Sequence, residues 1–268
     1  MSVAILAVLP LLVVALSLSG CRADKTTKPS EVLDSSQPVA ESAAPDAASE
    51  PSPAAANDKR PVIVCFGDSL TAGYGTDLGQ SYPDYLQTDL NAEGYNYRVV
   101  NEGISGNTTK DGVDRLDRVL ALKPAVVVVE FGGNDGLRGL RIEDSRTNLD
   151  RIVGTLKASG TKVVLAGITL PPDYGPDYIK QFDDTYATLA AKYHVPILPF
   201  LLKGVFGVDG MMQADRTHAT SAGNQIVAKN VLPLVTPLLK NRATRERRWA
   251  ASACRRCGGR LRVSRSGW

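Results

Sequence analysis

The sequence is poor in the residues that build disulfide frameworks and metal sites, with four cysteines and two histidines among 268 residues. The cysteines, at positions 21, 65, 254 and 257, are too few and too scattered to stabilise a fold through disulfide bonds. A tetrahedral zinc site needs four ligands, and the only histidines, His194 and His218, lie far along the chain from Cys254 and Cys257. This single Cys-x-x-Cys pair is therefore a weak metal signal, and we expect no disulfide framework.

Aromatic residues are also scarce, at 6%, while hydrophobic residues make up 43% of the chain. This composition is typical of one soluble domain with appendages and not of a membrane bundle. One longer apolar run is present, from Ala4 to Leu18. It is shorter than the roughly 20 residues that a spanning helix needs, and it suits the central region of a signal peptide.

The end of this run, Leu18-Ser19-Gly20-Cys21, resembles the lipobox of bacterial lipoproteins, in which the cysteine is diacylated and becomes the mature amino terminus. We therefore expect residues 1–20 to be a lipoprotein signal peptide and Cys21 to be lipidated. An uncleaved anchor and a plain signal peptide are the alternatives. No Lys or Arg precedes the run, so either the true start lies upstream or the free amino terminus supplies the only positive charge there.

Two further segments have the composition of disordered chain. Residues 22–59 are rich in Ala, Pro, Ser, Asp and Glu, which predicts a flexible linker over residues 21–59 that begins at the lipidated cysteine. Residues 241–268 hold nine Arg against one Glu, so this tail carries most of the positive charge of a chain whose net charge is only +3. Few aromatics accompany these arginines, which argues against nucleic-acid recognition.

Between these segments, residues 60–240 alternate short apolar runs with stretches of helical spacing. This alternation predicts βαβ units and a five-stranded parallel sheet that is covered by helices on both faces. The expected strands are 61–66, 97–100, 125–129, 162–168 and 195–198, and the expected helices are 81–94, 111–122, 143–158, 178–193 and 221–239. In such sheets the functional site lies where the carboxyl ends of the strands lead into loops.

The first strand leads directly into Gly67-Asp68-Ser69-Leu70, which places a serine at such an end. Alone, this string is as often a turn or a helix cap as a site. A serine hydroxyl becomes a nucleophile only when a base within hydrogen-bond reach removes its proton. His194 precedes the last strand, at the wrong end of the sheet, and is best interpreted as a surface residue at a helix end. His218 follows Asp215 by three residues in a polar break before the last helix, and this spacing lets the carboxylate orient the imidazole.

Acyl transfer also requires donors for the developing oxyanion, and two other strand ends offer them. Gly106 follows the second strand and can present its backbone N–H without a side chain in the way. Asn134 follows the third strand, in Gly132-Gly133-Asn134-Asp135, and its side-chain amide can donate. With Ser69, Asp215 and His218, these residues make a complete acyl-transfer set.

The segments around Ser69, Gly106, Asn134 and His218 resemble the four ordered sequence blocks of the SGNH or GDSL hydrolase family. Three longer strings resemble the bacterial thioesterase/arylesterase/lysophospholipase branch of this family: Gly132–Gly139, Leu170–Gly175 and Val195–Phe200. The resemblance covers about residues 60–240. It implies a flavodoxin-like three-layer αβα sandwich, no metal or other cofactor, and an oxyanion hole formed by the Ser69 N–H, the Gly106 N–H and the Asn134 side chain. Ala219 stands where the family usually has Pro after the His, a departure that bears on the rigidity of this loop.

The resemblance thus predicts a serine esterase that hydrolyses carboxylic esters or thioesters through an acyl-serine, with a small acyl ester or a lysolipid as substrate. A polysaccharide O-deacetylase is an alternative, as is a lipid-tethered binding protein that has lost turnover. Export and lipidation at Cys21 predict a cell-envelope lipoprotein that faces the periplasm, in the outer membrane where the organism has one. Neither the natural acyl chain nor the oligomeric state follows from the sequence.

Overall fold

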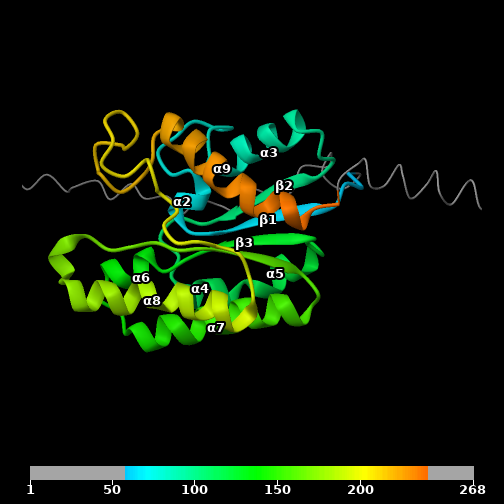
Figure 1. Ribbon diagram of the computed structural model, residues 1–268. Coiled ribbons are helices and arrows are strands. Elements are labelled where there is room, and N and C mark those ends of the chain that lie inside the picture. The colour runs from blue at the N-terminus through cyan, green and yellow to red at the C-terminus, as the bar shows by residue number, and fades with distance from the viewer. Residues whose placement is uncertain (1–57, 241–268) are drawn as a thin grey trace, which may run out of the picture. The chain divides into compact units, whose positions relative to one another are not determined.

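A parallel sheet of apolar strands forms the centre of the fold (Figure 1). In the computed structural model, which describes residues 58–240, the strand order is β2-β1-β3-β4-β5. The central strands β1 and β3 are buried along their whole length, as expected for a sheet covered on both faces. The five strands are β1 (Val62–Gly67), β2 (Arg98–Gly103), β3 (Val126–Glu130), β4 (Lys162–Ala166) and β5 (Ile197–Leu198).

Helices cover both faces of the sheet, with α3 and α9 on one side and α4, α5, α7 and α8 on the other (Figure 1). Several begin at side chains that cap free backbone N–H groups, such as Thr108 before α4 and Thr220 before α9. The α-helices are α2 (Ser69–Ala72), α3 (Tyr82–Ala92), α4 (Thr109–Asp114), α5 (Leu116–Ala121), α6 (Gly133–Leu137), α7 (Ile142–Ala158), α8 (Pro176–Tyr193) and α9 (Ser221–Val235). Two 3-10 turns, Pro172–Tyr174 and Thr236–Leu238, complete the elements.

The predicted three-layer α/β sandwich with five parallel strands is confirmed. The helix predicted over 111–122 divides at Arg115, whose guanidinium donates to the carbonyl oxygens of Gly67 and Glu102 at the ends of β1 and β2. Strand β2 continues to Gly103 beyond its predicted end because it pairs with β1 over that whole length. The short helices α2 and α6 were not predicted.

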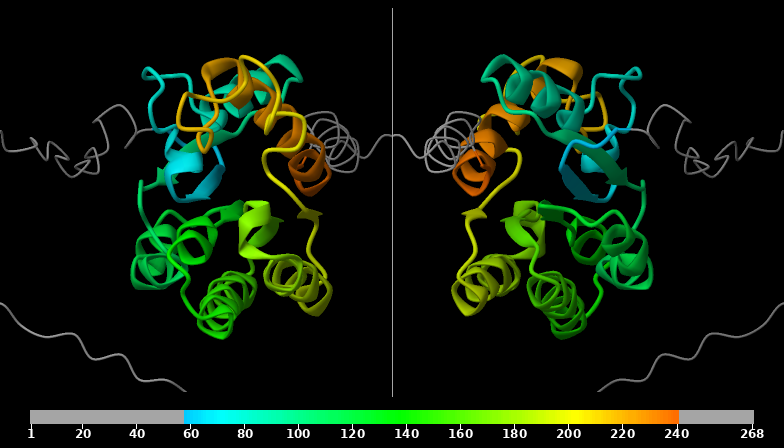
Figure 2. Two further views of the ribbon diagram at one scale, coloured as in Figure 1. Left: turned by 90° about the vertical axis from the view of Figure 1, so that its left-hand side faces the viewer. Right: turned by 90° about the vertical axis from the view of Figure 1, so that its right-hand side faces the viewer.

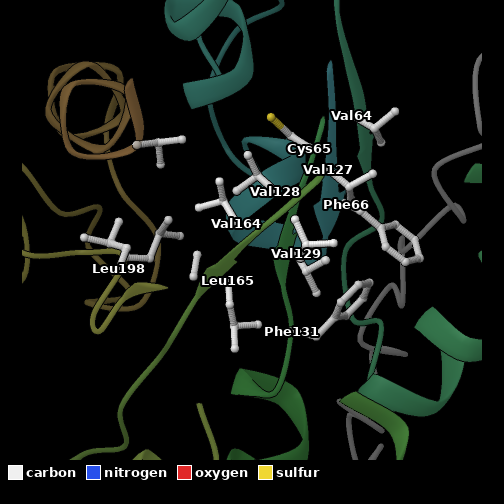
Figure 3. Packing of buried hydrophobic residues seen from close by; sticks show 14 of the residues in the cluster. Val64, Cys65, Phe66, Val127, Val128, Val129, Phe131, Val164, Leu165 and Leu198 are labelled. Carbon is white, nitrogen blue, oxygen red and sulfur yellow. The ribbon is translucent and has the colours of Figure 1, made fainter. Parts of the chain in front are cut away.

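Interlocking side chains from neighbouring strands fill the core (Figure 3). The rings of Phe66 and Phe131 meet edge to face with their centroids 4.8 Å apart, an arrangement that aromatic pairs prefer. Burying each such side chain contributes about 1.5–3 kcal/mol. Cys65 lies among them as a fully buried free thiol, and burial raises its pKa to about 12.

The carboxyl ends of all five strands point to the same edge of the sheet, on the left in Figure 1 and toward the viewer in the left panel of Figure 2. Helices α2 and α6 and the segment 199–220 lie at this edge. No helix within residues 58–240 is long and apolar enough to cross a membrane. The predicted signal peptide, the predicted lipidation site Cys21, the predicted linker up to residue 57 and the tail with Cys254 and Cys257 lie outside the described residues.

Candidate active site

Ser69 is the first residue of α2 and follows β1 after a single intervening residue, Asp68. The Asp68 carboxylate caps this short helix by accepting the Leu70 N–H at 3.0 Å. The helix lies directly against the end of β2, where a Cβ on Gly103 would come within 2.1 Å of the Ala72 nitrogen. Only glycine leaves room for this approach, so the end of β2 helps to position the nucleophile.

The base is carried by a small antiparallel hairpin that precedes α9. Its two arms are joined by the Gln213 N–H, which donates to the His218 carbonyl at 2.8 Å, and by the Thr220 N–H, which donates to the Met211 carbonyl at 2.9 Å. Met212 and Ala219 pair across it. At the tip, Arg216 adopts the left-handed conformation with φ of 55°, which is uncommon for a residue other than glycine.

The structure brings the three predicted triad residues together in one line. Ser69 Oγ lies 2.8 Å from His218 Nε2, and His218 Nδ1 lies 2.7 Å from Asp215 Oδ2. Asp215 Oδ1 accepts the His218 N–H at 3.0 Å and the Thr217 N–H at 2.9 Å, so both carboxylate oxygens are engaged. Partial burial works to raise the pKa of Asp215, but the hydrogen bonds from His218 and Thr217 outweigh it and lower that pKa. The carboxylate thus stays ionised and holds the imidazole with Nε2 toward the serine.

The predicted oxyanion donors, Gly106 and Asn134, line the same cavity as Ser69 and His218. Gly106 has φ of 79°, a conformation that L side chains rarely adopt, and its carbonyl accepts a hydrogen bond from Arg138 at 2.9 Å. Within residues 58–240 neither the Ser69 N–H nor the Gly106 N–H donates to another protein group. Both are therefore free to donate to an oxyanion.

The Asn134 amide, in contrast, already has two acceptors. Its Nδ2 donates to the Asn107 carbonyl at 2.9 Å and to Asp68 Oδ2 at 3.2 Å. Since a side-chain amide has only two N–H donors, Asn134 can serve an oxyanion only by sharing or exchanging one of these bonds. The longer bond, to Asp68, is the one that yields more easily.

A pair of buried carboxyl groups, Asp68 and Glu130, lies beneath the nucleophile. Glu130 Oε2 accepts the Thr71 hydroxyl at 2.8 Å and the Asp68 N–H at 3.4 Å, while Oε1 is buried without a hydrogen-bond partner among the described residues. Burial raises the pKa of Asp68 to about 6. Burial and then the charge of Asp68 raise the pKa of Glu130 well above its usual range, so we assign the proton of the pair to Glu130. Glu130 escaped prediction, although an acid that ends a run of valines was the available signal.

Gln213 is a second residue that the sequence did not reveal. Its side-chain amide donates to the Tyr74 carbonyl at 2.7 Å and to the Ala219 carbonyl at 2.9 Å. It therefore ties the His218 hairpin to the loop that follows the nucleophile helix. The Tyr74 ring lies against the His218 ring, with centroids 4.6 Å apart. Nothing in its sequence neighbourhood distinguishes Gln213 from an ordinary polar loop residue.

A cavity of about 280 Å³ opens above the triad. Ser69, Gly106, Asn134 and His218 lie on its polar side, and most of its remaining lining is apolar. The apolar lining residues are Leu70, Tyr74, Leu137, Ile168, Leu170, Pro171, Phe200, Leu202 and Phe206. A few polar groups that converge at one end of an apolar pocket are the usual arrangement of a small-molecule site.

The other histidine, His194, lies elsewhere. It caps the carboxyl end of α8 in a left-handed conformation and is exposed at the opposite edge of the sheet, before β5. Within residues 58–240 no three His, Cys, Asp or Glu side chains are grouped so that they could hold a metal ion.

Comparison with known proteins agrees with this geometry. Residues 65–226 match the model of the GDSL-like Lipase/Acylhydrolase family. The chain belongs to this family. Esterase TesA of Pseudomonas aeruginosa is 47% identical over 178 residues, which cover 66% of this chain and 89% of that protein. Together with the site, this membership makes the chain a serine hydrolase that acts on ester bonds.

A further relative and a solved structure show the same relationship. The Thioesterase 1/protease 1/lysophospholipase L1 of Escherichia coli strain K12 is 34% identical over 180 residues, which cover 67% of this chain and 85% of that one. A crystal structure of TesA is 46% identical and superposes with a TM-score of 0.64, covering 66% of this chain and 99% of the other. The similarity therefore spans nearly the whole of the family members and, in this chain, the described domain.

Proposed function

We propose that the protein hydrolyses carboxylic esters and thioesters that carry an apolar acyl chain, such as lysophospholipids, through an acyl intermediate on Ser69. The observation that carries this proposal is the Ser69–His218–Asp215 line, with contacts of 2.8 Å and 2.7 Å, beside an apolar cavity. Such a cavity can take an acyl chain while the carbonyl carbon lies next to Ser69 Oγ. The names of the relatives, which include esterase and lysophospholipase, support the same substrate class.

In the first half of the reaction His218 Nε2 takes the proton of the Ser69 hydroxyl while Oγ attacks the carbonyl carbon. Asp215 stabilises the imidazolium that forms. The carbonyl oxygen gains the negative charge and accepts the N–H groups of Ser69 and Gly106. His218 then gives its proton to the leaving alcohol or thiol, and the acyl group remains on Ser69.

The third donor acts through an exchange of hydrogen bonds. Asn134 keeps its 2.9 Å bond to the Asn107 carbonyl and turns its other N–H from Asp68 toward the oxyanion. A bond that strengthens only as charge develops on the substrate favours the transition state over the ground state. In the second half of the reaction a water molecule gives a proton to His218 Nε2 and attacks the acyl carbon. His218 then gives this proton to Ser69 Oγ as the bond between Oγ and the acyl carbon breaks, which releases the acid and restores the Ser69 hydroxyl.

An acyl-chain panel tests the substrate class. We expect p-nitrophenyl esters and acyl thioesters of medium or long chains to be cleaved with higher kcat/KM than the acetyl ester, because a longer chain removes more apolar surface from water. A strict preference for acetyl would instead support the polysaccharide O-deacetylase. Labelling by a fluorophosphonate, with Ser69→Ala as control, separates both from a binding protein without turnover, which would not be labelled.

We further propose that the protein is exported and tethered to the cell envelope through a lipidated Cys21, facing the periplasm, in the outer membrane where the organism has one. The apolar run and the Leu18-Ser19-Gly20-Cys21 string support this proposal. Wild-type protein should incorporate a radiolabelled fatty acid in the cell, and Cys21→Ala should not. Equal label in both proteins would contradict lipidation.

A further inference from the structure

The large hydrophobic side chains that are exposed within residues 58–240 all lie at one edge of the domain. They come from the segments that follow β1, β3 and β5, where Leu137 ends α6 and the others lie in loops. Each is at least 42% exposed, and Leu78 is fully exposed. These loops lie at the edge that carries the nucleophile and the base (Figure 1 and the left panel of Figure 2). We call them the apolar rim: Tyr74, Leu78, Leu137, Leu140, Phe206 and Val208.

The rim is continuous with the catalytic cavity. Tyr74, Leu137 and Phe206 line that cavity as well as being exposed, whereas Leu78 and Val208 project from the same loops outside it. Exposed hydrophobic side chains that occur singly need no explanation, but a group of them around one opening marks an interaction surface.

Hydrogen bonds hold the rim in place. The carbonyl oxygens of Leu137 and Leu140 each accept a tyrosine hydroxyl, from Tyr174 at 3.0 Å and from Tyr178 at 3.3 Å. Leu78 lies in a turn closed by the Gln80 N–H and the Asp77 carbonyl at 3.1 Å. The backbone is thus braced at these points while the apolar side chains point away from the core.

We infer that the apolar rim docks the domain on a lipid surface, from which amphiphilic esters enter the cavity. This inference rests on the proposed function. A protein partner seated on the rim would close the opening through which substrate must pass, whereas a lipid surface would supply that substrate. Charges of both signs flank the rim, at Asp77, Arg138, Arg141 and Asp209, which suits a zwitterionic surface.

The length of chain before the domain permits this orientation. A flexible chain as long as the segment between Cys21 and Asp58 would have a root-mean-square span of roughly 30–36 Å. This span is enough for either edge of the domain to face the bilayer, so the tether supplies proximity and the rim supplies orientation.

The test uses the full-length protein and a variant in which three rim residues that do not line the cavity are changed, Leu78→Ser, Leu140→Ser and Val208→Ser. A matched control carries Glu93→Ser, Ala121→Ser and Lys157→Ser, which are exposed at the opposite edge of the sheet. Two rates are measured: hydrolysis of soluble p-nitrophenyl acetate, and hydrolysis of monoacyl phosphatidylcholine in phosphatidylcholine vesicles. Measuring the second rate again with anionic phosphatidylglycerol vesicles tests whether the rim prefers a zwitterionic surface.

We expect the rim variant to hydrolyse soluble p-nitrophenyl acetate at the wild-type rate and the vesicle substrate at least tenfold more slowly than wild type. The control should keep both wild-type rates. Equal vesicle rates in rim variant and control would overturn the inference. So would a wild-type dimer that the rim variant converts to a monomer without loss of the vesicle rate, since the rim would then be an interface between copies. Failure of the proposed function is distinguishable, because the wild-type protein would then leave monoacyl phosphatidylcholine uncleaved even when that lipid is supplied without vesicles.

Discussion

The nucleophile and its base reach the site from contrasting surroundings. Ser69 begins a helix that is anchored by three buried polar residues: Asp68 caps it, Thr71 belongs to it, and Glu130 accepts hydrogen bonds from both. His218 lies on a hairpin whose tip, residues 214–217, is exposed, and the side chain of Asp215 is 40% exposed. The nucleophile is thus held by the core, and the base is held by a few bonds that can be removed singly. Substitutions of the buried residues that anchor the Ser69 helix should affect mainly folding, and substitutions in the hairpin should affect mainly turnover.

The largest effect should come from removing the groups that react. Ser69→Ala and His218→Ala should each lower kcat by about a millionfold, because neither group activates the reaction without the other. The double variant should lose no more than either single variant. Rates with a p-nitrophenyl ester, on samples whose circular dichroism matches wild type, test this. Losses that multiply in the double variant would show that the two regions act independently.

The next largest effect concerns the oxyanion donor Asn134, which lines the cavity beside the nucleophile. Asn134→Ala should lower kcat by roughly a hundred- to a thousandfold, as loss of one oxyanion donor does, and change KM little. Steady-state kinetics measure both parameters, and the melting temperature reports any loss of folding. A change confined to KM would mean that Asn134 only binds substrate.

Substitution of Gln213 tests the hydrogen bonds that hold the exposed hairpin. Gln213→Met removes the bonds to the Tyr74 and Ala219 carbonyls and should lower kcat roughly five- to fiftyfold, since small displacements of a base are costly. Gln213→Glu is the matched variant, which keeps the shape and loses the donor. The melting temperature should change little in either variant. Unchanged kcat in both would show that the hairpin needs no clamp.

A second-site change sharpens the same prediction. Ala219→Pro restores the residue that the family usually has after the histidine, and no described hydrogen bond uses the Ala219 N–H. Proline restricts the residue before it, which here is His218, to extended conformations. Added to Gln213→Met, it should recover part of the lost kcat. No recovery would indicate that Gln213 acts on Tyr74 and not on the hairpin.

The last prediction concerns the pH dependence of stability on the buried side, where we expect the smallest effect on turnover. Glu130 keeps in the folded protein a proton that the unfolded chain releases above the ordinary pKa of 4.5. Stability should therefore fall as pH rises from about 4.5, by about 1.4 kcal/mol per pH unit for one proton, until the raised pKa is reached. Glu130→Gln cannot release this proton, so its unfolding free energy should depend less on pH. Urea unfolding between pH 4.5 and 8 measures the difference, and parallel curves would contradict the protonated Glu130.

Much of this architecture could be predicted because it depends on local patterns. Runs such as Ala125–Val129 have the composition of buried parallel strands, and Ser69, Asn134 and His218 follow from their places at strand ends or before the last helix. The sequence also located both ends of the nucleophile–base pair, and the structure brings them within 2.8 Å.

What escaped prediction depends on contacts between distant segments. The 111–122 helix breaks at Arg115 because its guanidinium reaches the ends of β1 and β2. Glu130 has only the weak signal of an acid that ends a run of valines, and Gln213 has no local signature. Each matters through a partner more than fifty residues away, Thr71 and Tyr74 respectively. The apolar rim is likewise invisible in the sequence, where its members look like ordinary core residues.

The buried thiol of Cys65 lies in the strand that carries the nucleophile, four residues before Ser69. With its pKa raised to about 12, it is inert toward alkylating reagents as long as β1 stays paired on both sides. Modification of this cysteine, followed peptide by peptide, therefore reports how often the central strand is exposed to solvent. The rate of Cys65 modification therefore measures the opening of the core, and it does so independently of catalysis.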